Sequence, residues 1–174
     1  MLNIYINTWG NYNERGADLG EWVTLPMDAD ELEEKLNEIA ERMHDNDPEF
    51  FINDYEWTTA IEGRKICENE NIEELNEYIQ ALDNLSEWEQ KVYCAAVEYW
   101  GGEYIDLDDL DEYVLHEDIE NEYDLGYYWA VESGCYDLER MGNLAHYIDY
   151  EAFGRDINME TDGGFTSFGW IERC

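Results

Sequence analysis

Basic residues are scarce in this sequence. Nine Lys and Arg stand against 45 Asp and Glu, which gives a formal net charge of −36. Proteins that bind nucleic acid carry a basic footprint, so this charge argues against nucleic acid as a partner. Charge of this size also destabilises a compact state by self-repulsion. Such a charge needs an explanation, and three explanations are possible: a basic partner, bound divalent cations or a high-salt cytoplasm.

Cysteine, proline and long apolar runs are also sparse. The chain has four Cys with no CxxC pair, and two Pro with no Gly/Ser-rich run. These features predict reduced thiols and no flexible linker. No stretch approaches the roughly 18 apolar residues that span a membrane, and the first residues lack the pattern of an export signal. We therefore expect no membrane contact and a cytoplasmic location.

Aromatic residues are abundant instead. They make up 15% of the 174 residues, and hydrophobic residues make up 44%. Between Val92 and Glu139 the sequence has no Lys or Arg, yet Tyr and Trp recur among its many acids. A block of like charge is typical of a disordered tail, but side chains of this kind at this density need a core to enter. The sequence predicts a folded body with a negative surface.

Residues 1–60 have a mixed pattern. Alternating apolar residues predict strands at Asn3–Thr8 and Glu21–Leu25, and a third strand at Phe50–Trp57. Apolar residues at helical spacing predict an amphipathic helix over residues 29–43. The cluster Gly10–Asn13 predicts a turn. Together these elements predict a three-stranded antiparallel sheet with one helix.

Residues 61–102 have a helical pattern. Asn71 and Ser86 are typical N-caps, and each precedes apolar residues at helical spacing. Gly101 and Gly102 are expected to end the second helix. This region is predicted to be a helical hairpin or a small bundle.

Residues 103–174 are mixed again. A short acidic helix around Leu107 and a strand at Tyr113–His116 both remain open. Further helices are predicted from Asp118 to Gly134 and over Leu138–Ala152, with Met141, Leu144, Ala145, Ile148 and Ala152 facing inward. Glycine turns and alternating aromatics predict a terminal hairpin over Gly163–Ile171.

The order mixed, helical, mixed predicts the α+β class. We expect an elongated chain of three small domains: an N-terminal α+β domain (residues 1–60), a helical domain (61–102) and a C-terminal α+β domain (103–174). No internal repeat is present.

No catalytic, cofactor or metal site is predicted. The segment from Asp106 to Asp111 with Glu117 resembles an EF-hand loop, but Leu110 stands where an oxygen ligand is required and Asp111 where Gly is required. The three His are isolated, and the nucleophile, zinc and phosphate-loop motifs are missing. With 45 acids in the chain, a pair at any chosen spacing means little. We expect no enzyme activity and no cofactor.

The rows of acids are the candidate binding site. On the helix over residues 29–43, the acids between Glu31 and Glu41 recur about every 3.3 Å of rise, against about 3.4 Å per phosphate in one DNA strand. The net charge of −36 equals that of about 61 Å of duplex. The predicted partner-binding acids are Glu31, Glu33, Glu34, Glu38, Glu41, Glu70, Glu73, Glu74, Glu77, Asp106, Asp108, Asp109, Asp111, Glu112, Glu117, Asp118, Glu120 and Glu122. The alternatives are an acidic module for another basic DNA-binding protein, or halophilic adaptation.

Two segments resemble a known family. Ile148–Ile157, with the sequence IDYEAFGRDI, is similar to the C-terminal signature of the ArdA antirestriction proteins. Tyr5–Glu14 and Gly20–Pro26 resemble the opening of that family. Length, acidity and the order of the regions agree along nearly the whole chain.

The resemblance implies a function. ArdA proteins are encoded on mobile genetic elements and inhibit type I restriction–modification enzymes. They mimic B-form DNA and occupy the DNA-binding channel of the specificity and methyltransferase core. The family fold is a curved rod of three domains, and two chains form a homodimer through the third domain, without catalysis.

The C-terminal motif is expected to be structural and to lie at the dimer end. Gly154 is expected to supply a backbone conformation or a close approach. Arg155 is expected to pair with Glu151 or Asp156, and Tyr150 and Phe153 to pack. The motif residues are Asp149, Tyr150, Glu151, Phe153, Gly154, Arg155 and Asp156.

Overall fold

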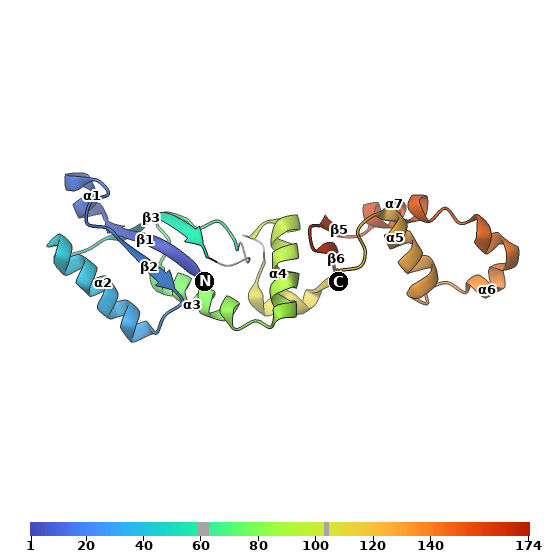
Figure 1. The fold of residues 1–174 in the computed structure, drawn as a ribbon, viewed down its shortest axis with the longest axis horizontal. Coiled ribbons are helices and arrows are strands. Elements are labelled where there is room, and N and C mark those ends of the chain that lie inside the picture. Colours follow the sequence, from blue (N-terminus) through green and yellow to red (C-terminus); the bar gives the residue numbers. More distant parts are fainter. Residues whose placement is uncertain (59–62, 103–104) are drawn as a thin grey trace. The chain divides into compact units, whose positions relative to one another are not determined.

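A computed structural model describes residues 1–58, 63–102 and 105–174. By contacts the chain divides into two compact units, residues 1–86 and 87–174. Each unit combines helices with its own three-stranded antiparallel sheet (Figure 1), so the α+β class is confirmed. The division into three domains, and the elongation, stay predictions. Its first boundary, at residues 60–61, and the start of its third domain, at residue 103, lie outside the described residues.

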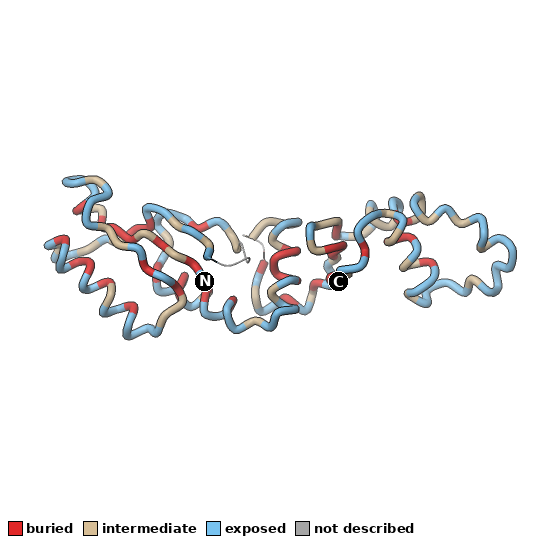
Figure 2. The backbone as a smooth tube through the Cα atoms, in the orientation of Figure 1, coloured by how far each residue is buried: buried red, intermediate tan, exposed pale blue. Residues whose placement is uncertain are grey.

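The sheet of the first unit is the one that the alternating pattern predicts. Its strands are β1 (Leu2–Thr8), β2 (Glu21–Leu25) and β3 (Phe50–Trp57), in the order β2-β1-β3. Ile4 and Ile6 on β1 are fully buried, so one face of the sheet is the core face. The buried cluster of this unit combines residues of the strands with residues of the neighbouring helices, and Figure 2 shows buried segments on both.

Two long helices complete the core of the first unit. The helix α2 (Ala29–Met43) has the predicted bounds, and its N-cap Asp28 accepts a hydrogen bond from the Asp30 amide. The helix α3 (Ile72–Asp83) also contributes buried residues to this core. In addition, Asn76 exchanges two hydrogen bonds of 2.9 Å with the backbone of Met27.

The expected turn at Gly10–Asn13 is wrong. These residues belong to the short helix α1 (Trp9–Arg15). The Thr8 side chain accepts a hydrogen bond from the Asn11 amide and so caps the helix. Trp9 stacks on Phe51 with a centroid distance of 4.1 Å, and this tertiary contact holds the segment helical against its Gly and Asn content.

The second unit is built on the helix α4 (Glu87–Trp100) and a second sheet. The strands are β4 (Tyr113–His116), β5 (Gly163–Thr166) and β6 (Gly169–Arg173), in the order β4-β6-β5. Both options left open after residue 103 are realised in succession, because the 3-10 helix η2 (Leu107–Glu112) runs directly into β4. The terminal hairpin is as predicted.

The remaining helices differ from the prediction. The helix expected from Asp118 begins after the N-cap Asn121, as α5 (Glu122–Tyr127), and continues as the π-helix η3 (Tyr128–Glu132). The single helix expected over Leu138–Ala152 is wrong. The structure has α6 (Leu138–Met141), the 3-10 helix η4 (Gly142–Tyr147) and then α7 (Tyr150–Glu160).

Two local features break the expected helix. Gly142 has a φ of +57°, which an α-helix does not contain, and Asp149 caps α7 through a hydrogen bond from the Ala152 amide. Some of the residues that were expected to face inward are therefore exposed. Leu144 is 68% exposed and Met141 41% exposed, and neither α6 nor η4 contains a buried residue.

Candidate functional site

The helix α2 presents a row of carboxylates. Its apolar stripe, including Leu32, Leu36 and Ile39, is buried against the sheet of the first unit. The opposite face is left to the acids, because helical periodicity separates the two sets. All the predicted acids of this helix are exposed: Glu31, Glu33, Glu34, Glu38 and Glu41.

The bases of α2 leave this row largely unopposed. Lys35 Nζ lies 2.6 Å from Glu21 Oε1, and Arg42 Nη1 lies 2.5 Å from Glu21 Oε2. Lys35 also contacts Glu38 Oε2, at a longer 3.4 Å. The hydrogen bonds from Lys35 and Arg42 lower the pKa of Glu21, and the bond to Glu21 raises the pKa of Lys35. Both cations are directed toward one carboxylate on β2, away from most of the row.

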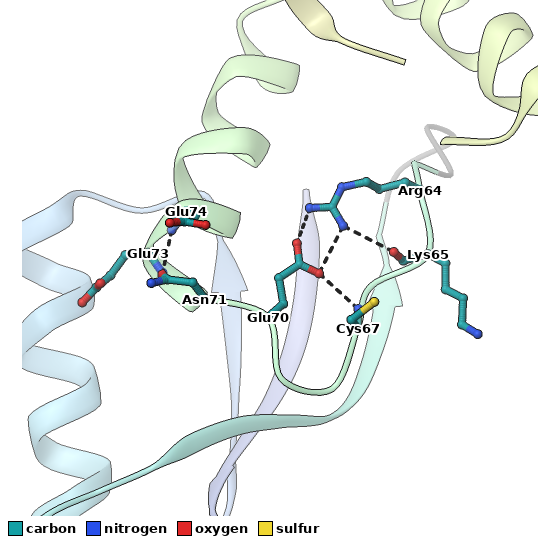
Figure 3. Close-up of polar contacts among 7 residues, drawn as sticks. All are labelled: Arg64, Lys65, Cys67, Glu70, Asn71, Glu73 and Glu74. Atoms are coloured by element: carbon teal, nitrogen blue, oxygen red, sulfur yellow. Dashed lines mark hydrogen bonds and ion pairs between the residues drawn. The ribbon is translucent and has the colours of Figure 1, made fainter. Parts of the chain in front are cut away.

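The acids before and on α3 divide into two kinds (Figure 3). Arg64 makes two hydrogen bonds to the Glu70 carboxylate, which also accepts one from the Cys67 amide at 3.1 Å. The Glu70 side chain is only 15% exposed, so its charge is largely satisfied within the fold. Glu73 and Glu74 are exposed, and their amides donate to the N-cap Asn71. Glu77 is exposed as well.

The acids of the second unit are mostly exposed. Asp106 caps η2 by accepting a hydrogen bond from the Asp108 amide. Two acids of this set pair with bases: Glu112 with Arg173 and Glu117 with Lys91, each at 2.6 Å. Glu112 and Glu122 are half-buried, and the rest are exposed: Asp106, Asp108, Asp109, Asp111, Glu117, Asp118 and Glu120.

The EF-hand resemblance does not extend to the structure. Residues 107–116 form a 3-10 helix and a strand, which is not a calcium-binding loop. Across residues 1–58, 63–102 and 105–174, no three His, Cys, Asp or Glu side chains are grouped closely enough to hold a metal ion. Within the same residues, no helix combines the length and apolar character of a membrane span.

The C-terminal motif contains a close helix crossing. A Cβ at Gly154 of α7 would lie 1.8 Å from the Glu122 carbonyl oxygen, and a Cβ at Gly126 of α5 would lie 1.9 Å from the Tyr150 carbonyl oxygen. Both distances are far inside van der Waals contact, so each helix requires glycine at the crossing. The motif thus holds α5 against α7.

Comparison with known families places the chain in one of them. A family model described as antirestriction protein (ArdA) matches residues 4–172, nearly the whole chain. The chain belongs to the ArdA family of antirestriction proteins. A comparison with curated protein sequences gave no match.

Most of the other motif residues of this ArdA chain have local partners. The Tyr150 ring packs edge-on against Tyr123 and Tyr127, at 5.7 and 5.4 Å between centroids. Phe153 packs edge-on against Tyr136 at 5.6 Å. Arg155 lies 3.6 Å from Glu151 on the exposed side of α7. Asp156 is exposed.

Sequence reasoning missed two features of this ArdA chain. One is Gly126, the partner of Gly154 in the helix crossing, for which the available signal was a glycine inside the helix predicted from Asp118 to Gly134. The other is the face of the first sheet that points away from the core, with Trp22 on its edge strand β2. The alternation of Glu21–Leu25 already separates Trp22 from the buried Val23 and Leu25.

Proposed function

We propose that this ArdA chain mimics B-form DNA and occupies the DNA-binding channel of type I restriction–modification enzymes. The observation that carries the proposal is the separation of charges. Exposed carboxylates recur along α2, α3 and η2. By contrast, Lys35, Arg42 and Arg64 are held by acids of their own unit.

The mechanism is competitive occupation. A channel that binds DNA of many sequences carries Lys and Arg for phosphates, and phosphate contacts hold most of the non-specific affinity. A folded row of carboxylates supplies the same charges without base information. The acids on α2 and α3 are already ordered by helix packing, so binding costs little conformational entropy. No catalytic step or cofactor is needed.

We further infer a homodimer through residues 140–148. Other long acid-free stretches, such as residues 1–13 and 163–171, place buried strand residues in the two cores. Residues 140–148 also lack acids, yet Leu144 is 68% and Tyr147 83% exposed. Beside them lies an apolar hollow of about 180 Å³ lined by residues such as Met141, Ile148 and Phe153. A surface that carries no acid and exposes Leu144 and Tyr147 suits a second copy of so acidic a chain, because the carboxylates of the two copies stay apart.

Sedimentation tests the dimer. Leu144→Asp places a charge in the acid-free surface and is expected to shift the protein from dimer to monomer. Met159→Asp is the matched control, since Met159 is 69% exposed and lies outside residues 140–148. A wild-type monomer at micromolar concentration, or equal behaviour of both variants, contradicts this interface.

A competition assay tests the central proposal. The protein is titrated into a type I enzyme that holds labelled cognate duplex, at two salt concentrations. We expect displacement of the duplex, weaker at the higher salt concentration. Displacement should not depend on the target sequence of the enzyme. If micromolar protein displaces no DNA even at low salt, the proposal fails.

A further inference from the structure

We propose that the open face of the first sheet, at Trp22 on the edge strand β2, binds an arginine side chain on the basic surface of the partner protein. This inference rests on the proposed function, because the partner is the DNA-binding enzyme. It adds a contact that charge mimicry does not contain. Phosphates and carboxylates offer only charge and hydrogen-bond acceptors, whereas Trp22 offers an aromatic plane.

Strand alternation directs Trp22 away from the core. Its neighbours Val23 and Leu25 are buried, and Glu21 on their side of the strand pairs with Lys35 and Arg42 of α2. Trp22 therefore lies on the opposite face of β2, where it is 48% exposed. A large aromatic side chain with half its surface in water is a natural candidate for a contact residue.

The strand register defines the neighbours of Trp22. On this face Tyr5 of β1 lies between Trp22 of β2 and Asp54 of β3. In the adjacent row Asn3 lies between Thr24 and Glu56. Neighbouring strands are about 4.8 Å apart, so Trp22 on one edge strand is separated by about 10 Å from Asp54 and Glu56 on the other. We call these the aromatic edge and the carboxylate edge of the face. Asp54 and Glu56 are both exposed.

The aromatic edge is held in place. The Tyr5 hydroxyl donates a hydrogen bond of 2.8 Å to the Ala17 carbonyl, and a Cβ at Gly20 would lie 2.5 Å from the Tyr5 ring. The Trp22 ring packs on Tyr5 with a centroid distance of 5.4 Å. The other end of this face is covered, since Trp9 and Tyr12 of α1 pack on Phe51. The uncovered part of this face is thus limited to the end at Trp22, where Tyr5 holds the indole in position.

Arginine fits this arrangement best. A guanidinium stacks on an indole plane through cation–π and planar contact, and it donates hydrogen bonds to carboxylates. The side chain is long enough to lie over Tyr5 between the indole and the carboxylate edge. No base stands among the six register positions of the face, and an anionic ligand would be repelled by Asp54 and Glu56. A DNA-binding channel is the kind of surface that offers arginine.

Three variants at Trp22 isolate the contact. Association of full-length wild type, Trp22→Ala, Trp22→Leu and Trp22→Phe with the type I enzyme is measured over a series of salt concentrations. We expect Trp22→Ala and Trp22→Leu to weaken binding roughly 5- to 30-fold at every salt concentration. Trp22→Phe should retain most of the affinity, because it keeps an aromatic plane. The slope of log K against log salt should not change, since no charge is altered.

Trp88→Ala is the matched control, because Trp88 is also 48% exposed and lies in the second unit. Its affinity should equal that of the wild type. Thermal unfolding of each variant shows that the fold is retained. Suppose that the wild type displaces DNA and that Trp22→Ala and Trp22→Leu bind the enzyme as tightly as the wild type. The arginine contact is then wrong, and the proposal of DNA mimicry is unaffected. If Trp22→Leu changes the oligomeric state instead, the face binds a second copy and the inference fails. If the wild type displaces no DNA, both proposals fail.

Discussion

At the scale of single residues, several of the few bases form ion pairs that join two elements of one unit. Glu21 shows this most clearly, because it joins β2 to α2 through both Lys35 and Arg42. The Arg173–Glu112 pair likewise joins β6 to η2 in the second unit. Glu21 thus engages two bases and Glu112 one, so three cations are neutralised by acids of their own unit. These ion pairs join elements within each unit, while the acids of the row on α2 stay exposed.

Glu21→Gln tests this role through the pH dependence of stability. Hydrogen bonds from Lys35 and Arg42 hold the pKa of Glu21 below its ordinary value. Its contribution is therefore full above the unfolded-state pKa of about 4.3 and is lost as the pH falls through the lower folded-state pKa. We expect the variant to be less stable than wild type by about 0.5–1 kcal/mol at pH 7, with the difference vanishing in acid.

Urea unfolding of both proteins from pH 7 to pH 3 measures this difference. Glu33→Gln removes the same charge from the exposed face of α2 and serves as the control. It should cause little loss of stability at any pH, because it relieves repulsion. A Glu21→Gln difference that is constant with pH would contradict the ion-pair explanation.

Gly154→Ala should destabilise the second unit. In a helix this substitution ordinarily adds about 0.5–1 kcal/mol of stability. Here the new Cβ would meet the Glu122 carbonyl at 1.8 Å, so we expect a loss of about 1–3 kcal/mol or more. Gly10→Ala in α1 is the control, because its Cβ would meet only the end of the Asp45 side chain. Denaturant unfolding measures both, and stabilisation by Gly154→Ala would show that the crossing is not tight.

At the scale of elements, amphipathic periodicity was sufficient where packing follows one helix or one sheet. Although local spacing leaves both a helix and a strand open at β4, the bounds of α2, the strands of the first sheet, the terminal hairpin and the cap at Asn71 could be predicted from it alone. Two elements could not. The helix α1 forms because Trp9 and Tyr12 meet Phe51, some 40 residues away in sequence, and the break after Met141 depends on Gly142 at positive φ. The ion pair between Glu70 and Arg64 also depends on the tertiary structure. The sequence alone therefore predicted Glu70 as one more partner-binding acid.

The row on α2 provides the element-scale prediction. A variant with Glu31, Glu33, Glu34 and Glu38 all changed to Gln should bind the enzyme more weakly, with a shallower slope of log K against log salt. A control with Glu14, Asp18, Asp45 and Asp47 changed to the amides alters the net charge equally. Its loss of affinity should be much smaller, because these acids do not form a row on one helix. Equal losses would show that net charge alone, without arrangement, drives the inhibition.

At the scale of the whole molecule, the net charge of −36 both lowers the stability of the fold and provides the charge that the proposed function requires. Self-repulsion of so many carboxylates opposes the compact state, and the aromatic and aliphatic cores of the two units offset it. Composition alone could indicate this balance. It could not show which acids are consumed by internal pairs, nor that a stretch without acids, residues 140–148, lies exposed beside an apolar hollow.

The most direct test of the central claim compares two salt dependences. The association constant of a type I enzyme is measured over a range of salt concentrations, once with this protein and once with duplex DNA. If the carboxylates act as phosphates, the two plots of log K against log salt fall with similar slopes, because a comparable number of charge contacts forms in both complexes. Binding of the protein that hardly changes with salt, while binding of DNA falls steeply, would contradict DNA mimicry.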